Sequence, residues 1–153
     1  MAEFVPPGAG WRRVPPGERA RSMPKTEAVS ILVVDDDPNS LDIVRTYLEA
    51  RGYRVATAAD GKEALSRMEE VRPGLVLLDV MMPGMDGWEV ARVIKNHPDF
   101  GPVRVVMLTA RSDFTDKQLG LRAGADDYIV KPIRLEDLGS RVERNLRALE
   151  RPA

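Results

Sequence analysis

Short apolar runs alternate with longer stretches of mixed polarity from about residue 29 to the end of the chain. The longer stretches place apolar residues three and four positions apart, which indicates amphipathic helices. Four apolar runs, each followed by a polar residue, are Ile31–Val34, Leu75–Leu78, Val105–Leu108 and Tyr128–Val130. A fifth run, residues 53–57, is more polar and predicts a strand near a sheet edge. The alternation predicts βαβ units and a parallel sheet.

Capping and breaking residues divide the chain into five predicted helices. Pro38 opens the first helix, because proline is favoured in the first turn, and Gly52 ends it. The other helices are expected after Asp60, near Asp86, from about residue 113 to 123, and from Leu135. Right-handed crossovers place such helices on both faces of the sheet. We therefore expect an α/β protein with a doubly wound, five-stranded parallel sheet.

Composition excludes several classes of protein. The 153 residues carry a net charge of -1, so no strong field favours nucleic acid or an anionic membrane. The chain has no cysteine, which excludes disulfides and thiolate metal sites. No apolar run approaches the roughly 18 residues of a membrane span, and no signal-peptide core is recognisable. We expect a cytoplasmic protein that binds neither membrane nor nucleic acid directly.

The first 28 residues differ from the rest. They are rich in proline and glycine, repeat Val-Pro-Pro-Gly twice, and carry five basic against three acidic side chains. Such a segment buries too little apolar surface to offset the entropy of ordering. We predict a flexible tail over residues 1–28 and a folded domain over residues 29–150. The tail is a linker, a segment upstream of a start at Met23, or a polyproline docking arm.

Polar residues of different chemistry follow the predicted strands. They are Asp35 and Asp36, Asp79, Thr109 and Lys131. In a doubly wound sheet the carboxyl ends of the strands share an edge, so these side chains should converge there. Clustered carboxylates repel one another, and without a cation at least one pKa should rise. Oxygen ligands favour Mg²⁺ or Mn²⁺ over zinc, while a hydroxyl and an ammonium suit a phosphoryl group.

The loop after Asp79 adds to this signal. Met81-Met82-Pro83-Gly84-Met85-Asp86-Gly87 combines a tight proline-glycine turn with a helix cap at Asp86. The backbone carbonyls near Met81 are free to face a metal. The methionines alone would suggest a soft metal, but the hard carboxylates argue against one.

Together these motifs resemble the receiver domain of bacterial two-component response regulators, over residues 30 to about 149. The resemblance rests on Val33–Asp37, Leu77–Gly87, Leu108–Ala110, Gly124–Tyr128 and Lys131-Pro132. It implies a flavodoxin-like fold with strand order 2-1-3-4-5. It also implies a signalling switch rather than an enzyme, one that assists its own phosphorylation and dephosphorylation.

The resemblance also implies roles for the residues of the site. Asp79 accepts a phosphoryl group from a sensor histidine kinase or a histidine phosphotransfer protein. Mg²⁺ is bound by the side chains of Asp36 and Asp79, by Asp35 through water, and by the backbone carbonyl of Met81.

The remaining roles concern the response to phosphorylation. Lys131 pairs with the phosphoryl group and precedes a cis bond to Pro132. Thr109 moves to bond the phosphoryl group, and Tyr128 turns inward. The readout face, which controls a downstream effector protein, comprises the fourth helix, the fifth strand and the fifth helix.

Alternatives remain for the role of the chain. It is expected to be a stand-alone receiver, and the alternative is a receiver fragment of a larger regulator with an output domain. It is a monomer or a phosphorylation-promoted dimer, because Asp137 and Arg141 resemble dimer-face positions while Leu119 departs from them. A remote alternative is a haloacid-dehalogenase-like phosphatase with Asp35 as nucleophile, although Asn39 departs from that motif.

Overall fold

The computed structural model describes residues 3–5, 12–14, 30–100, 102–110 and 124–150. The strands are β1 (Glu3–Val5), β2 (Arg12–Val14), β3 (Ser30–Val34), β4 (Arg54–Ala58), β5 (Leu75–Asp79), β6 (Arg104–Ala110) and β7 (Asp127–Lys131). The helices within the described residues are α2 (Pro38–Ala50), α3 (Gly61–Val71), α4 (Gly87–Asn96) and α6 (Leu135–Glu150). The helix predicted over residues 113–123 lies outside the described residues.

Five parallel strands form the central sheet in the order β4-β3-β5-β6-β7. Counted along the chain, this is the expected order 2-1-3-4-5, and the predicted fold is confirmed. The polar strand β4 lies at an edge, as its composition predicted. All five residues of the middle strand β5 are buried, because helices cover both faces of the sheet.

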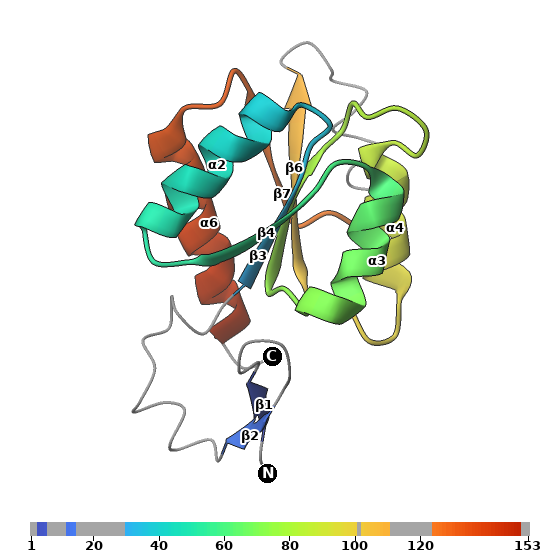
Figure 1. Ribbon diagram of the computed structural model, residues 1–153, viewed down its shortest axis with the longest axis vertical. Coiled ribbons are helices and arrows are strands. Elements are labelled where there is room, and N and C mark those ends of the chain that lie inside the picture. The colour runs from blue at the N-terminus through green and yellow to red at the C-terminus, as the bar shows by residue number, and fades with distance from the viewer. Residues whose placement is uncertain (1–2, 6–11, 15–29, 101, 111–123, 151–153) are drawn as a thin grey trace.

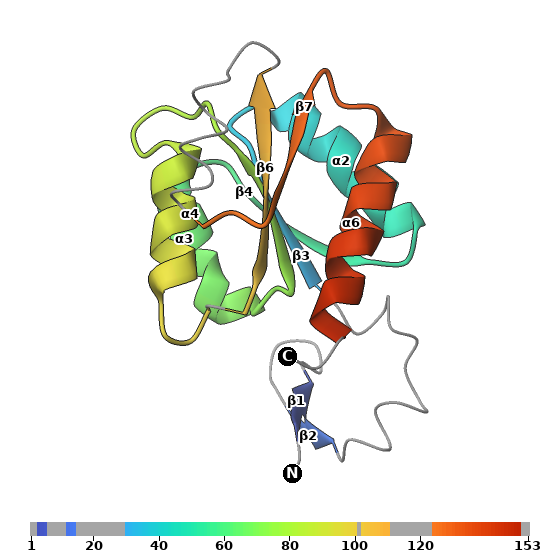
Figure 2. The same ribbon diagram turned by 180° about the vertical axis from the view of Figure 1, so that it is seen from behind.

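The helices form two layers, one on each face of the sheet. Helices α2 and α6 lie on one side, and α3 and α4 lie on the other (Figures 1 and 2). Alternate strand residues point to opposite faces, so the apolar strands supply two cores. Leu77 packs in the core under α2 and α6, whereas Leu78 packs in the core under α3 and α4. Burying each such side chain contributes about 1.5–3 kcal/mol.

Aspartates cap three of the described helices at their amino ends. Asp37 accepts a hydrogen bond from the backbone N–H of Asn39 at 3.1 Å and so caps α2. Asp60 and Asp86 cap α3 and α4 in the same way. Each cap contributes about 1 kcal/mol. The carboxylate of Asp37 is thus occupied by the helix, although it follows Asp35 and Asp36 directly.

Helix α4 begins at Gly87, where it passes very close to strand β5. A Cβ atom at this position would lie 2.3 Å from the backbone oxygen of Asp79 and 2.8 Å from Cα of Val80. We expect Gly87→Ala to lower the free energy of unfolding by about 2–3 kcal/mol, because backbone must move to admit the methyl group. Urea denaturation measures this. The control is Arg92→Ala at an exposed site of the same helix, and equal midpoints for both variants would contradict the close approach.

The amino-terminal segment contains one feature that its composition did not predict. Strands β1 and β2 pair antiparallel, with Phe4 opposite Arg13. The boundary near residue 29 and the flexibility of the tail stay predictions.

Candidate functional site

The carboxyl ends of four strands bring the expected polar residues to one edge of the sheet. Asp35 directly follows β3, and Asp79 is the last residue of β5. Thr109 lies near the end of β6, and Lys131 is the last residue of β7. These strands are neighbours in the sheet. The convergence predicted from the sequence is therefore present in the fold.

Three carboxylates and one ammonium group form the centre of this edge. One carboxylate oxygen from each of Asp35, Asp36 and Asp79 lies within 4.8 Å of the others. Nζ of Lys131 lies 2.9 Å from Oδ1 of Asp79. Asp35 and Asp79 are only 5% and 3% exposed, whereas Asp36 is exposed to solvent. The cluster is thus a largely buried acidic group that opens to water on one side.

The electrostatics of the cluster are most evident at Asp35. The pKa of Asp35 is raised from 3.8 to about 6, chiefly by burial and to a smaller extent by the negative charges of Asp79 and Asp36. The backbone N–H of Asp37, which donates to Oδ1 of Asp35 at 2.9 Å, and the charge of Lys131 both lower this pKa. The expected rise of one carboxylate pKa is confirmed.

The donor set fits a hard divalent cation. Carboxylate oxygens are the ligands that such ions prefer, and the described residues offer no thiolate and no imidazole at this edge. A cation here would neutralise groups that otherwise repel one another. The acidic cluster of Asp35, Asp36 and Asp79 is therefore consistent with the metal site of a receiver domain.

The other predicted residues lie around this cluster. Thr109 is 1% exposed, and its Oγ1 has no hydrogen-bond partner among the described residues. Tyr128 is half-buried and packs against the core under α3 and α4. The backbone N–H of Met81 lies 3.4 Å from Oδ1 of Asp79. The peptide bond from Lys131 to Pro132 is cis, as the resemblance implies.

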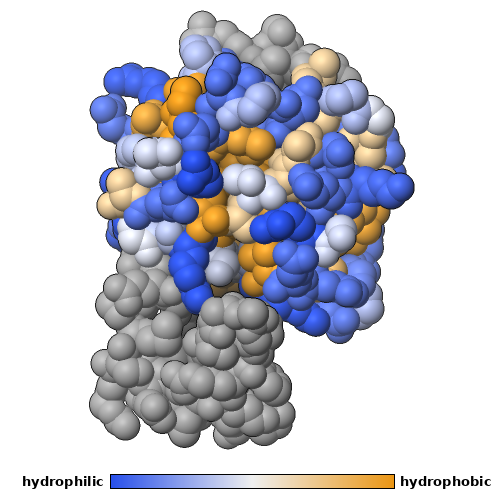
Figure 3. Space-filling model, in the orientation of Figure 1, coloured by the Kyte–Doolittle hydropathy of each residue, from blue (hydrophilic) through white to orange (hydrophobic). Residues whose placement is uncertain are grey.

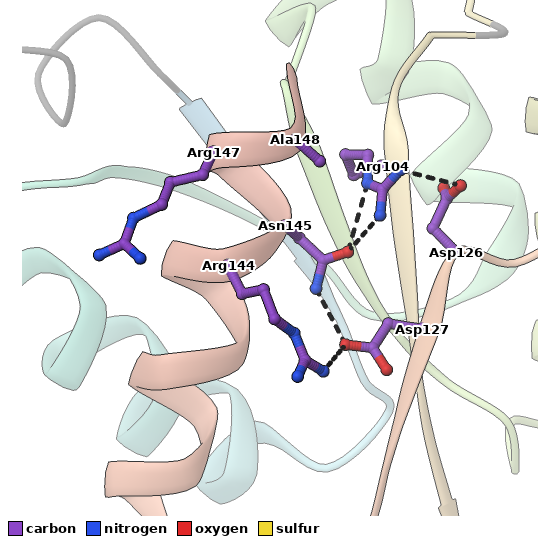
Figure 4. Close-up of a pocket in the computed structure, with 7 residues that line it drawn as sticks. All are labelled: Arg104, Asp126, Asp127, Arg144, Asn145, Arg147 and Ala148. Atoms are coloured by element: carbon purple, nitrogen blue, oxygen red, sulfur yellow. Dashed lines mark hydrogen bonds and ion pairs between the residues drawn. The ribbon is translucent and has the colours of Figure 1, made fainter. Parts of the chain in front are cut away.

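A second polar cluster, which the sequence did not reveal, joins α6 to the opposite ends of β6 and β7. Figure 4 shows Asn145 between Arg104 and Asp127, beside Arg144. Oδ1 of Asn145 accepts hydrogen bonds from Nε and Nη2 of Arg104 at 3.2 and 2.9 Å. Nδ2 of Asn145 donates to Asp127 at 3.0 Å, and Arg141 donates to the same carboxylate at 2.7 Å.

Asp127 is the hub of this second cluster. Burial alone would raise its pKa, but hydrogen bonds from Asn145, Arg144 and the backbone N–H of Tyr128, with the charge of Arg141, hold the pKa below its usual 3.8. The carboxylate therefore stays ionised and fixes α6 against the start of β7. Asn145 is 2% exposed yet polar. Its place among the apolar positions of helix α6 was the only sign of this second cluster in the sequence.

Few large apolar side chains are exposed in the part of the chain that the structure describes. Among the described residues, those that are exposed are Ile43, Met81, Val93 and Leu149. Figure 3 shows a mostly hydrophilic face with separate apolar patches. None of the described helices has the length and apolar character that a bilayer crossing requires.

Comparison with known proteins identifies the family. The response regulator receiver domain family matches residues 31–143. The chain is 48% identical over 120 residues to the DNA-binding response regulator MtrA of Mycolicibacterium smegmatis, covering 78% of this chain and 51% of that protein. It is 45% identical over 122 residues to the probable transcriptional regulator ycf27 of Cyanophora paradoxa, covering 80% and 50%. The chain thus spans about half the length of these relatives.

Solved structures agree with this family. The signal receiver domain of a signal transduction histidine kinase from Syntrophus aciditrophicus superposes with a TM-score of 0.76 at 37% identity, covering 82% of this chain and 96% of that one. Chemotaxis protein CheY4 of Vibrio cholerae superposes with a TM-score of 0.72 at 34% identity, covering 76% and 97%. With its sheet order, acidic cluster and sequence match together, the chain belongs to the response regulator receiver domain family.

Proposed function

We propose that this chain is a phosphorylation-dependent switch in which Asp79 accepts the phosphoryl group. Receiver domains are phosphoacceptors rather than catalytic enzymes. The proposed donor is a phosphohistidine of a sensor kinase or a phosphotransfer protein. Mg²⁺, with Mn²⁺ as a substitute, is proposed to bind Asp35, Asp36, Asp79 and the backbone carbonyl of Met81. It supplies positive charge that offsets the carboxylates and the incoming phosphoryl oxygens.

One contact carries the assignment to Asp79. Its Oδ1 lies 2.9 Å from Nζ of Lys131 at the end of the middle strand, so a phosphoryl group bound there would have a cation beside it. Asp35, in contrast, has an elevated pKa, so its carboxylate is less readily ionised. Asp79 is the better placed nucleophile of the two.

The transfer requires one bond to form and one to break. A carboxylate oxygen of Asp79 attacks phosphorus while the P–N bond to the donor imidazole breaks, and that nitrogen leaves with the electron pair and takes up a proton. Lys131 can then transfer its hydrogen bond from the carboxylate to a phosphoryl oxygen. Thr109, whose buried hydroxyl has no partner among the described residues, can donate a second hydrogen bond. Little covalent chemistry is required beyond positioning and charge neutralisation.

Signal output is proposed to follow from the movement of these side chains. The phosphoryl group adds about -1.5 to -2 charge, which shifts a two-state equilibrium rather than driving a rigid motion. Lys131 ends the strand whose first residue, Asp127, is bound to α6. We therefore propose that Tyr128, strand β7, helix α6 and the predicted helix at residues 113–123 form the face that an effector protein reads.

Two candidates remain for the protein in which this receiver acts. One candidate is a receiver that acts alone on a partner in the cytoplasm. Similarity to a DNA-binding response regulator and to a probable transcriptional regulator supports the other candidate, a receiver within a longer regulator. The reading frame beyond Ala153 in the source genome separates the two. An in-frame winged or helix-turn-helix domain would support the second.

The position of the acyl phosphate tests the assignment against the phosphatase alternative. After incubation with acetyl phosphate and Mg²⁺, borohydride reduces an aspartyl phosphate to homoserine, which peptide mass spectrometry can locate. We expect homoserine at Asp79. Homoserine at Asp35 would support the phosphatase alternative and overturn the proposal.

A further inference from the structure

Met81 stands out among the methionines of the chain. Its side chain is 68% exposed, the largest exposed fraction among the large apolar residues of the described chain. Met68 and Met107 are fully buried, Met82 is 7% exposed, and Met85 is half-buried. Exposure governs how readily a thioether is oxidised. Within the described residues, Met81 is therefore the methionine that an oxidant in solution reaches most easily.

The backbone of Met81 lies beside the acceptor site. Met81 follows Asp79 by two residues, and its backbone N–H lies 3.4 Å from Oδ1 of Asp79. The chain has no cysteine, so methionine is its only sulfur-bearing residue type. Because the Met81 side chain is exposed and its backbone borders Asp79, a change in the polarity of this side chain would occur within two residues of the acceptor.

We propose that Met81 is a redox modification site that controls how long the phosphoryl group persists on Asp79. A peroxide transfers one oxygen atom to the sulfur: a sulfur lone pair forms the S–O bond, the O–O bond breaks, and water leaves. The thioether becomes a sulfoxide and hydrogen peroxide is reduced. The reaction is reversible by sulfoxide reductases. The effect on the phosphoryl group rests on the proposed function of Asp79, whereas the selective oxidation does not.

The physical consequence follows from the change of polarity. The thioether is apolar and accepts hydrogen bonds weakly, so it holds water poorly. The sulfoxide carries a strongly polar S–O bond that accepts hydrogen bonds from water. Ordered water beside an acyl phosphate is the nucleophile that hydrolyses it. We therefore expect oxidation to shorten the phosphoryl lifetime.

The first measurement tests the selectivity alone. The full chain is treated with hydrogen peroxide, and peptide mass spectrometry measures the oxygen added to each methionine. Met81 should oxidise at least about five times faster than Met68, Met82, Met85 or Met107, as their exposure predicts. Equal or faster oxidation of any of these four would overturn the proposal.

The second measurement tests the consequence. Protein is treated with peroxide, freed of it, phosphorylated with acetyl phosphate and saturating Mg²⁺, and then followed by intact mass after the donor is removed. We expect the half-life of the phosphoryl group to fall by about threefold or more, since polar groups that position water commonly contribute such factors. Treatment with sulfoxide reductases should restore the original half-life.

Matched variants separate Met81 from other sites of damage. Met81→Leu, compared with its own untreated sample, should lose the response to peroxide, whereas Met85→Leu should keep it. Met81→Gln, which places a polar amide at the position, should shorten the half-life without peroxide. An unchanged half-life after full oxidation of Met81 would overturn the proposal while phosphorylation itself still supported Asp79. Failure of the untreated protein to take up phosphate would instead overturn the proposed function.

Discussion

Replacing Asp79 with asparagine is expected to abolish phosphorylation of this chain by acetyl phosphate. The amide is nearly isosteric but cannot form an acyl phosphate as a carboxylate does. The side chain ends the buried strand β5, is 3% exposed, and is the carboxylate that contacts Lys131. Intact-mass spectrometry after incubation with Mg²⁺ should show no phosphorylated species. Single removal of a covalent nucleophile commonly costs many orders of magnitude in rate.

Asp37→Asn is the matched control for this variant. It removes the same charge two residues after Asp35, yet Asp37 caps α2 and asparagine is an equally good cap. We expect this variant to be phosphorylated at close to the rate of the unaltered chain. Phosphorylation that persisted in Asp79→Asn would contradict the role of Asp79. Loss of phosphorylation in both variants, with both folded, would contradict it as well.

Replacing Asp35 with asparagine is expected to stabilise the metal-free protein while removing its response to Mg²⁺. Burial raises the pKa of Asp35 to about 6, so keeping this group ionised at neutral pH costs folding free energy. The shift corresponds to roughly 3 kcal/mol as an upper bound, and water entering the open side of the cluster reduces this to about 1–2 kcal/mol. That difference should raise Tm by roughly 3–6 °C in EDTA.

Mg²⁺ should raise the Tm of Asp35→Asn less than it raises the Tm of the unaltered chain. A ligand that binds only the folded state raises its stability by mass action, so saturating Mg²⁺ should raise the Tm of the unaltered chain. The variant lacks one of the three carboxylates and should gain much less. Asp37→Asn should behave like the unaltered chain in both buffers. A Tm increase with Mg²⁺ as large in Asp35→Asn as in the unaltered chain would argue against a cation at this cluster.

The raised pKa of Asp35 also determines how the stability difference between Asp35→Asn and the unaltered chain depends on pH. The folded state binds the Asp35 proton more tightly than the unfolded chain, so the metal-free protein gains stability as pH falls through about 6 toward 3.8. Asp35→Asn lacks this contribution. Its advantage in EDTA should therefore be largest near pH 7.5 and close to zero near about pH 4, measured by urea denaturation. An advantage that grew as pH fell would contradict the assignment.

The sheet and the acceptor edge could be predicted because they depend on local patterns. Apolar runs define the strands, and parallel pairing then places Asp35, Asp79 and Lys131 at one edge regardless of the details of side-chain packing. The cap at Asp86 was equally predictable, since its side chain bonds to the backbone only three residues away.

The cluster around Asp127 could not be predicted, because it does not depend on local sequence patterns. It joins Arg104, Asp127 and Asn145, which are far apart in the sequence, and it depends on the rotation of α6 against the sheet. Asn145 precedes the buried Leu146 and follows Val142 by three positions, so spacing alone cannot distinguish a buried amide from a solvated one. The pairing of β1 with β2 was missed because proline and glycine dominated that segment.

Mg²⁺-dependent phosphoryl transfer to Asp79 can be measured on the purified chain. Purified chain is incubated with acetyl phosphate in Mg²⁺ or in EDTA, and peptide mass spectrometry locates any phosphoryl group. We expect one phosphoryl group per chain, on the peptide that contains Asp79, in Mg²⁺ only. Uptake that is equal in EDTA, or that is found on another residue, would contradict Mg²⁺-dependent transfer to Asp79.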